Sequence, residues 1–303
     1  MAGNRKASRK KAKGRASKST AKFPGLFRNI LLFSVLALPL ALLYLLPLAG
    51  KRLPSDRPPF ENFSPAPNTP VKKYRPSPRP SVPFKLPMLA ILIDDMGYDA
   101  FIDKKFIDIQ APLSFAFLPF APNTVHLARY ARKRKKDILV HIPMEPENKK
   151  LNPGPGVLTL ELDFDHLLQT LRDDLASVPG AVGANNHMGS RFTTNRKAME
   201  IVLAYIKSKG LFFIDSRTTK DTVAFDVAME LGVPCAQRSV FLDHSTSPGD
   251  IRYEIRRAVK LAKEHGSAIA IGHPGRTTYQ VLYRQIPLIR KEVRLVPVHR
   301  LVH

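Results

Sequence analysis

Two adjacent aspartates, Asp94 and Asp95, follow an apolar run in the stretch AILIDDMGYD. Two neighbouring carboxylates repel one another unless a cation or a hydrogen-bond network relieves the repulsion. Because successive strand residues point to opposite faces, we expect the pair where the strand breaks into the loop MGYD. The pair is a candidate for metal binding and proton transfer, and two solvated loop acids are the alternative.

Further polar residues follow other apolar runs in the same way. The stretches are LVHIPMEP, GANNHMGSRFT, LFFIDSRT, FLDH and AIAIGHPG, and the residues are His141, Glu145, Asn185, Asn186, His187, Asp215, Ser216, Arg217, Asp243, His244 and His273. A single histidine in an apolar run is more often a hydrogen-bonded core residue than a ligand. Three histidines at the ends of different runs, His141, His187 and His273, favour a shared site.

Short apolar runs alternate with amphipathic segments from residue 88 onward. The runs cover 88–93, 113–118, 138–142, 181–184, 211–214, 235–242, 267–271 and 293–298, and helical patterns cover 124–135, 164–178, 196–210, 222–232 and 251–266. This alternation predicts an α/β fold with a parallel sheet buried on both faces. Its length favours a distorted or incomplete barrel of about seven strands, with the polar residues above at the carboxyl-terminal strand ends.

The amino-terminal part has two segments of different character. Residues 1–28 contain ten Lys or Arg and no acid, and residues 29–50 are an uncharged apolar stretch. The apolar stretch is long enough to cross a bilayer and longer than a cleaved signal peptide requires. We expect a basic cytoplasmic tail, a single-pass anchor in a bacterial inner membrane and a periplasmic carboxyl-terminal part.

Residues 51–87 contain eleven prolines, which predicts an extended linker before a domain at 88–303. Of the net charge of +23, residues 51–303 carry +13 and the 1–28 tail carries the remaining +10. Membrane topology explains the charge of the tail, so we expect no nucleic acid as a partner. The Pro- and Gly-rich segment 144–163 predicts a loop at the rim of the site. Cys235 is the one cysteine, which excludes an intramolecular disulfide and favours a buried strand thiol.

The stretches IDDMGYD, LVHIPMEP, GANNHMGSRFT, LFFIDSRT and AIAIGHPG resemble the divergent polysaccharide deacetylases, relatives of the NodB-type carbohydrate esterases. The resemblance covers about 88–300. It implies a distorted (β/α) barrel that binds one divalent metal, usually zinc, and removes acetyl groups from N-acetylated sugars. In that reading Asp94 is the catalytic base, Asp95 and His187 are metal ligands, and His273 is the general acid.

The sequence departs from the common relatives at two places. Their second metal histidine, four residues after the first, corresponds here to Arg191, and His141 is the best replacement ligand. Their R-x-P-Y segment is absent, and FIDSRT is the nearest polar strand end. The predicted metal ligands are therefore Asp95, His141 and His187.

Other polar residues near these ends are candidates for substrate binding. They are Glu145, Asn186, Arg191, Asp215 and Arg217, and His244 is a candidate partner of a metal or acid–base residue. An arginine in such a place binds a substrate phosphate or carboxylate, or forms a structural ion pair.

Three functional hypotheses follow. The first is a membrane-anchored, metal-dependent hydrolase in which a metal-bound water attacks the acetyl group of N-acetylated envelope carbohydrate. The second is a non-catalytic envelope protein that retains the barrel and binds glycan or a cell-wall assembly partner. The third is a metal hydrolase of a non-sugar amide or ester.

Overall fold

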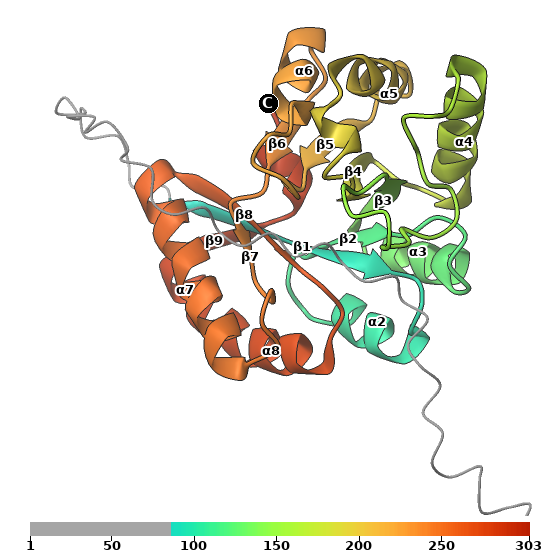
Figure 1. Ribbon diagram of the computed structural model, residues 1–303. Coiled ribbons are helices and arrows are strands. Elements are labelled where there is room, and N and C mark those ends of the chain that lie inside the picture. Colours follow the sequence, from blue (N-terminus) through green and yellow to red (C-terminus); the bar gives the residue numbers. More distant parts are fainter. Residues whose placement is uncertain (1–85) are drawn as a thin grey trace, which may run out of the picture. The chain divides into compact units, whose positions relative to one another are not determined.

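The computed structural model describes residues 86–303, and within this part nine strands form one parallel sheet (Figure 1). The strands are β1 (Met88–Met96), β2 (Ser114–Phe117), β3 (Asp137–Met144), β4 (Gly183–Met188), β5 (Phe212–Asp215), β6 (Cys235–Gln237), β7 (Val240–Phe241), β8 (Ser267–Gly272) and β9 (Arg294–Val296). Their order is β6-β5-β4-β3-β2-β1-β8-β7, and β9 pairs with the start of β1. The predicted α/β fold with an incomplete parallel barrel is confirmed, but the described part has nine strands instead of about seven.

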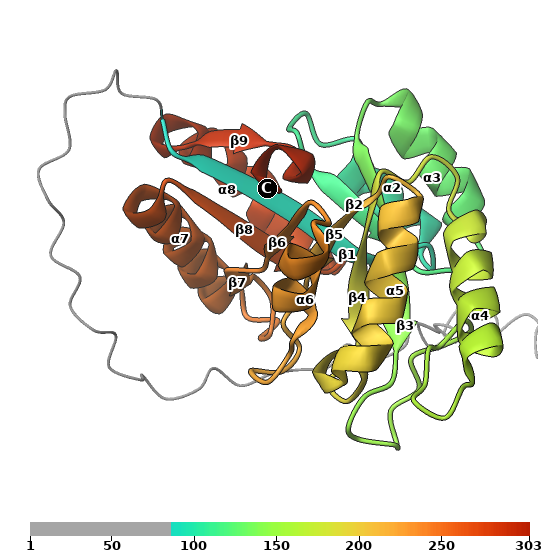
Figure 2. The same cartoon turned by 90° about the horizontal axis from the view of Figure 1, so that it is seen from above.

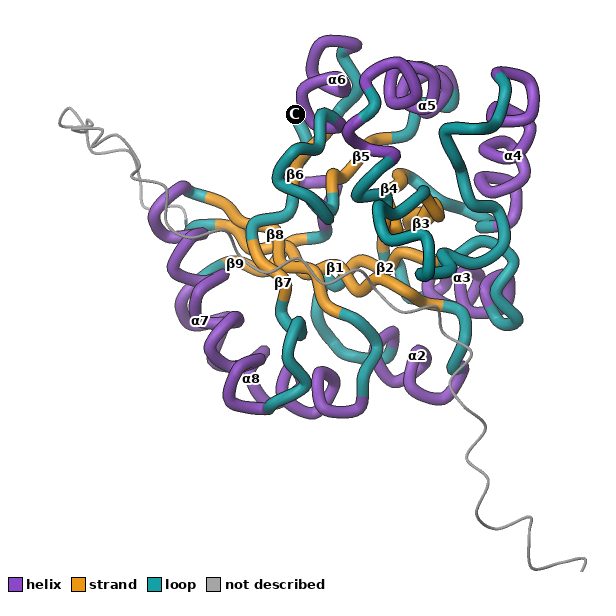
Figure 3. Tube along the Cα trace, viewed as in Figure 1, coloured by secondary structure: helices purple, strands orange, loops and turns teal. Residues whose placement is uncertain are grey.

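Seven α-helices of the described part connect these strands and pack outside the sheet (Figures 2 and 3). They are α2 (Ala100–Ile107), α3 (Thr124–Lys133), α4 (Phe164–Ser177), α5 (Arg196–Ser208), α6 (Ala224–Leu231), α7 (Pro248–His265) and α8 (Arg276–Glu292). Of two 3-10 helices in the same part, η2 (Phe192–Thr194) precedes α5, whereas η3 (Val298–Leu301) follows β9 and packs Val298 and Leu301 against the other face of the sheet. Side-chain caps start four of the α-helices, with Asp99, Asp163, Asn195 and Ser247 accepting from backbone N–H groups.

The sheet buries both of its faces. On β1, Leu89, Ile91 and Ile93 belong to the core between sheet and helices, whereas Ala90 and Leu92 belong to a second core on the concave face. The period of two along a strand sends alternate side chains into these two cores. This explains why the strand sequences are apolar at successive positions, as covered parallel strands require.

The predicted run 235–242 is two strands rather than one. Residues Arg238 and Ser239 separate β6 from β7, which lie at opposite ends of the strand order. The chain therefore crosses the opening of the incomplete barrel within a few residues. An apolar run interrupted by three polar residues, Gln237, Arg238 and Ser239, does not reveal this crossing.

The loop between β3 and α4, residues 145–163, is held against the rest of the domain. Leu158 is fully buried and its backbone pairs with the end of β3, and Glu147 N donates to Ser190 Oγ at 2.9 Å. Gly156, at φ +80°, leaves no room for a Cβ because Asp174 Oδ1 would lie 2.0 Å from it. The predicted rim loop is thus in close contact, at Gly156, with the buried carboxyl group of Asp174 in α4.

Asp174 is fully buried, and neither of its carboxylate oxygens has a hydrogen-bond partner among the described residues. Burial raises the pKa of this carboxyl to about 9, with a smaller contribution from neighbouring Asp173. Asp174 is therefore protonated at neutral pH.

The predicted tail, anchor and most of the linker, residues 1–85, lie outside the described residues. Among the residues that the structure describes, no helix has both the length and the apolar character needed to cross a bilayer.

Candidate metal centre

The residues predicted to bind metal or to transfer protons lie on the concave side of the sheet, at the carboxyl-terminal ends of β1, β3, β4 and β8. Leu139 on β3 and Ile271 on β8 belong to the concave core. Residues two positions further along these strands share that face, which places His141 and His273 above this core. On β4, Ala184 packs toward the helices, so Asn185 and His187 face the concave side.

A bulge in β1 turns both aspartates into this site. The pairing of β1 with β2 is regular up to Ile93 and resumes at Met96, and Asp95 between them has φ +54°. Met96 therefore packs into the core between sheet and helices. In a regular strand that continued the alternation of Leu89, Ile91 and Ile93, Asp95 would have pointed into that core instead. We predicted the pair at the strand end; the structure instead keeps it within the strand and changes the alternation there.

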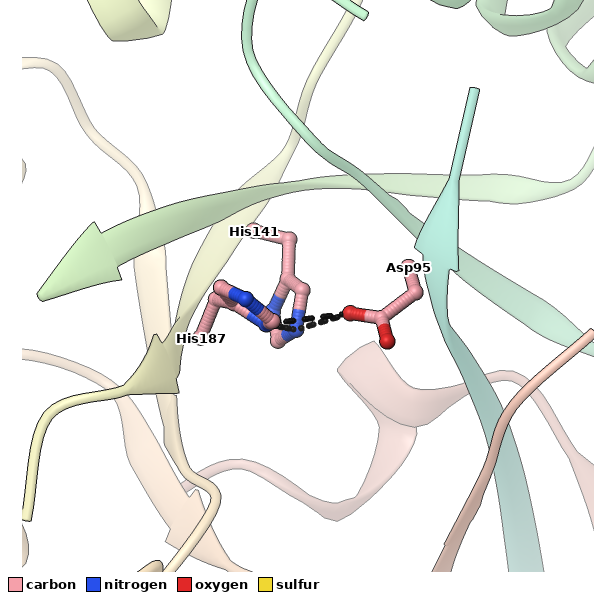
Figure 4. A group of neighbouring side chains, drawn as sticks. All are labelled: Asp95, His141 and His187. Atoms are coloured by element: carbon pink, nitrogen blue, oxygen red, sulfur yellow. Dashed lines mark hydrogen bonds and ion pairs between the residues drawn. The ribbon is translucent and has the colours of Figure 1, made fainter. Parts of the chain in front are cut away.

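Asp95, His141 and His187 converge, one from each of three strands (Figure 4). Asp95 Oδ1 lies 3.2 Å from His141 Nε2 and 3.0 Å from His187 Nδ1, and the two ring nitrogens are 3.2 Å apart. A tetrahedral zinc with ligands at about 2.0–2.1 Å separates neighbouring ligand atoms by about 3.3 Å. The three atoms therefore have the spacing of three ligands of one such ion.

The donor chemistry of these three residues also fits a cation. All three are at most 2% exposed, and Asp95 Oδ1 accepts no well-formed hydrogen bond within the described part of the chain. A buried carboxylate oxygen without a hydrogen-bond partner is costly unless another charge compensates it. Two imidazoles and a carboxylate suit a divalent transition metal such as zinc.

Asn185 connects His141, one of the three candidate ligands, to Asp94. Its Oδ1 lies 2.9 Å from His141 Nδ1, which leaves Nε2 as the ring nitrogen that faces Asp95 Oδ1 and His187. Its Nδ2 donates to both oxygens of Asp94 at 3.0 Å and to Ser216 Oγ at 3.1 Å. Asn185 therefore fixes the orientation of a ligand and of the predicted base at once.

The electrostatics of the two aspartates differ although they are adjacent. Burial raises the pKa of Asp94, and the nearby His141 and His273 offset part of this rise. Burial also acts on Asp95, but the imidazoles of His187 and His141 outweigh it and hold the pKa of Asp95 well below its usual value. Asp95 therefore remains an anion while Asp94 is the more basic carboxylate.

His273 is held by Asp243, a residue that precedes the predicted candidate His244. Its Nδ1 lies 2.8 Å from Asp243 Oδ1, and Asp243 Oδ2 accepts from the His273 backbone and from Thr278 Oγ1, each at 2.8 Å. Although burial opposes it, the Asp243 carboxylate raises the pKa of His273 to about 9. His244 is exposed on the loop that follows Asp243.

Glu145 and Arg191 join the 145–163 loop to the segment that follows β4. Arg191 Nη1 forms an ion pair with Glu145 Oε1, and Glu145 Oε2 accepts from the backbone of Leu160 at 2.9 Å. The Glu145 carbonyl accepts from the backbones of Arg191 and Phe192. The pair thus ties the 145–163 loop to the segment after β4, and a role in substrate binding stays a prediction for both residues.

Asn186, Asp215 and Arg217 also lie in internal networks. Asn186 Oδ1 accepts from Ser216 N at 2.9 Å and its Nδ2 donates to the Met188 carbonyl at 2.8 Å. Asp215 accepts from the backbone of Arg217 and from Thr222 Oγ1. Arg217, at φ +50°, donates to Gln237 Oε1 at 2.7 Å. Their predicted contacts with substrate likewise stay predictions.

Arg238 was absent from the predicted site. Its guanidinium donates to the carbonyls of Ser216 and Arg217 at 2.6 and 2.8 Å and lies 3.7 Å from the ring centre of Phe241. That ring in turn lies 5.8 Å from the ring of His273. Burial and the neighbouring Arg217 lower the pKa of Arg238 to about 10. The sequence signal was a charged residue within an apolar run, in CAQRSVFL.

The region that holds these residues matches a known family. The model of the family described as divergent polysaccharide deacetylase matches residues 91–302, which include every residue of this centre. The chain belongs to the divergent polysaccharide deacetylase family. The resemblance inferred from the sequence motifs is confirmed.

Two relatives match this chain at the level of sequence. YibQ from Escherichia coli strain K12 is 36% identical over 215 residues, which are 71% of this chain and 67% of YibQ. A protein from Haemophilus influenzae strain KW20 is 35% identical over 216 residues, which are 71% of this chain and 77% of the relative.

A solved structure shares the fold of this chain. The protein ATU2773 from Agrobacterium tumefaciens C58 aligns with a TM-score of 0.69 at 22% sequence identity, over 74% of this chain and 92% of the other. At this identity the likeness concerns the fold.

Proposed function

We propose that this protein is a metal-dependent hydrolase that removes acetyl groups from N-acetylated carbohydrate of the bacterial envelope. The observation that carries the proposal is the convergence of Asp95 Oδ1, His141 Nε2 and His187 Nδ1 at 3.0–3.2 Å. Membership of the divergent polysaccharide deacetylase family supports the carbohydrate amide as substrate.

Asp95, His141 and His187 would hold the metal, and their two imidazoles and one carboxylate suit zinc. Such an ion polarises a carbonyl oxygen and makes a water molecule a stronger acid. The ligand set leaves Asp94 outside it, with Oδ2 3.6 Å from His141 Nε2. Asp94 is thus a neighbour of the metal site that remains able to accept a proton.

Asp94 and His273 provide the two proton transfers that amide hydrolysis needs. Asp94, oriented by Asn185, accepts the proton of the attacking water at its carboxylate. His273 is protonated at neutral pH because its pKa is raised to about 9, so Nε2 can give a proton to the departing amine. Because Nδ1 of His273 is bonded to Asp243, Nε2 is the ring nitrogen that can face a substrate.

Burial of the centre is consistent with a small acyl group as the part of the substrate that enters. Asp94, Asp95, His141 and His187 are 1–2% exposed, and His273 is 8% exposed. His273 is thus the acid–base residue nearest to solvent, as expected of the group that protonates a leaving amine on a bulky sugar.

We further propose the location that the sequence predicts. Residues 29–50 anchor the chain in the bacterial inner membrane, the 1–28 tail is cytoplasmic, and the domain acts on the periplasmic side. On the periplasmic side the domain meets envelope carbohydrate, which is the proposed substrate. An envelope protein is a second partner to test.

The test combines metal content with acetate release. The purified chain and the variants Asp94→Asn, Asp95→Asn and His187→Ala are analysed for zinc, nickel, cobalt and manganese after preparation without chelators. The same samples are assayed for acetate released from peptidoglycan and from N-acetylglucosamine oligomers. His166→Ala, a change at an exposed histidine of α4, is the matched control.

We expect one equivalent of metal in the wild type, in His166→Ala and in Asp94→Asn, and loss of metal in Asp95→Asn and His187→Ala. Acetate release is expected only from the wild type and the control. Equal metal loss in Asp94→Asn and Asp95→Asn would contradict the division of roles. Metal binding without acetate release from either glycan would support a binding protein or a hydrolase of another amide.

A further inference from the structure

The domain carries exposed cations at the amino-terminal ends of its strands, the end opposite to the metal centre. We call this surface the base face; its cations are Arg132, Lys133, Arg134, Lys135, Lys207, Lys209, Lys263, Arg290, Lys291, Arg294 and Arg300. They lie in or after the last turns of α3, α5, α7 and α8, in β9 and in η3. In a parallel α/β fold each helix returns the chain to the start of the next strand, so these positions share one end.

Helix dipoles explain only part of this charge. Cations are favoured near helix carboxyl termini, and the last turns of α3, α5, α7 and α8 follow that rule. Lys135, two residues beyond α3, and Arg300, in a 3-10 helix, lie outside those turns. The base face is therefore more positive than helix termini alone require.

Three acids near this face already have cationic partners. The pairs are Asp108 with Arg134, Glu264 with Lys260, and Glu292 with Lys263. By contrast, Lys133, Lys135, Lys291 and Arg300 form no ion pair within residues 86–303. The surplus charge of the base face faces solvent and is available to an anionic partner.

The chain enters the domain at this same face. The backbone N–H of Arg294 donates to the carbonyl of Pro87 at 2.8 Å, and Met88 opens β1 beside Arg294 of β9. The segment that leads back toward the apolar residues 29–50 is therefore joined to the domain among the cations of the base face.

We propose that the base face docks onto a bilayer of anionic phospholipid. The proposal rests on the membrane anchor of the proposed function, since the anchor supplies the bilayer and the linker delivers the chain to this face. Docking directs the carboxyl-terminal strand ends, and with them the metal centre, away from the lipid. A deacetylase held in this way presents its site to polymer at a distance from the membrane.

The strength of the interaction follows from the number of cations. Each Lys or Arg close to an anionic bilayer strengthens attachment about five-fold, and the effect decays within a Debye length of about 8 Å at physiological salt. Charge reversal of three cations is therefore expected to weaken docking at least about 100-fold.

The test uses the full chain reconstituted into bilayers of phosphatidylcholine alone or mixed with phosphatidylglycerol, in both cases with a headgroup-labelled acceptor lipid. A donor dye is attached to Ser208→Cys on the base face or to Asn148→Cys in the loop after β3, with Cys235 replaced by Ala. Both host residues are exposed. Energy transfer reports how close each label lies to the bilayer.

The test variant carries Lys133→Glu, Lys135→Glu and Lys291→Glu, and the matched control carries Lys149→Glu, Lys150→Glu and Lys220→Glu. The control cations are exposed in loops at the carboxyl-terminal strand ends, and both variants change the net charge by the same amount. We expect phosphatidylglycerol to increase transfer from the Ser208→Cys label but not from the Asn148→Cys label. High salt and the test variant are expected to abolish the increase, and the control to retain it.

Equal transfer in the two bilayers, or equal loss in the test variant and the control, would overturn docking at the base face. Flotation of the chain with the bilayers at high salt reports the anchor separately. If the chain does not float there, the anchor is refuted and the docking proposal falls with it. Metal content and acetate release, measured in detergent, decide the catalytic proposal independently.

Discussion

Replacing Asp174 by Asn should stabilise the protein, and more so as the pH rises. In the folded chain the Asp174 carboxyl is fully buried and its pKa is raised to about 9, whereas the value in an unfolded chain is 3.8. A raised folded pKa gives stability that is present below the unfolded pKa and is lost as the pH rises toward the folded pKa. The asparagine amide has nearly the same shape and takes up no proton in this range.

The magnitude follows from the proton that folding must supply. At pH 7 the unfolded carboxylate is ionised and the folded one is protonated, which costs at most about 4 kcal/mol at 1.36 kcal/mol per unit of pKa. Between pH 5 and pH 8 the wild type should lose about 4 kcal/mol more stability than Asp174→Asn. Above pH 9 the difference should become constant.

Urea unfolding of the purified chain, followed by circular dichroism at pH 5 and pH 8, measures this difference. Asp173→Asn, which removes an exposed acid one residue away and with it the smaller contribution to the raised pKa of Asp174, is the matched control and should lose nearly as much stability as the wild type between pH 5 and pH 8. The reasoning is refuted if Asp174→Asn is less stable than the wild type at pH 8. It is also refuted if the two proteins lose equal stability between pH 5 and pH 8.

Two further predictions concern the metal centre. Asn185→Leu removes the acceptor of His141 Nδ1 and should weaken zinc binding by about 10- to 100-fold in calorimetry, with His166→Ala unchanged; unaltered affinity would contradict the orienting role. Asp243→Asn removes the carboxylate that raises the pKa of His273, so the alkaline fall of kcat/KM, expected near pH 9 in the wild type, should move toward neutral pH; an unmoved limb would show that His273 is not the general acid.

The alternation of apolar runs and amphipathic helices was sufficient to predict the parallel α/β fold and the end of the sheet that bears the polar residues. It also predicts that polar residues at strand ends of one parallel sheet meet at one edge, where Asp95, His141 and His187 lie together. Their assignment as metal ligands comes from the resemblance to the family. Arg191, in the place of a ligand of the common relatives, instead pairs with Glu145. The candidate ligand in its place, His141, comes from a different strand.

The residues that orient the site could not be predicted from one sequence. Asn185 faces His141 because β3 and β4 pair in that register, and register is set by the whole sheet rather than by the local sequence. Asp243 and His244 are adjacent polar residues after a short strand, and the direction of each side chain depends on where β7 ends. Arg238 similarly acquires its contacts through the crossing from β6 to β7.

The bulge in β1 makes the spacing of the ladder, and not only residue identity, a requirement for the site. Asp94 and Asp95 reach the same histidine because one residue more than regular pairing allows lies between Ile93 and Met96. A homologous chain with both aspartates but an uninterrupted strand would turn one of them toward the helices, into the layer where Met96 now packs. A search for such centres by the pair of letters alone would therefore collect proteins that lack the site, and a one-codon deletion in this strand would abolish it without touching either aspartate.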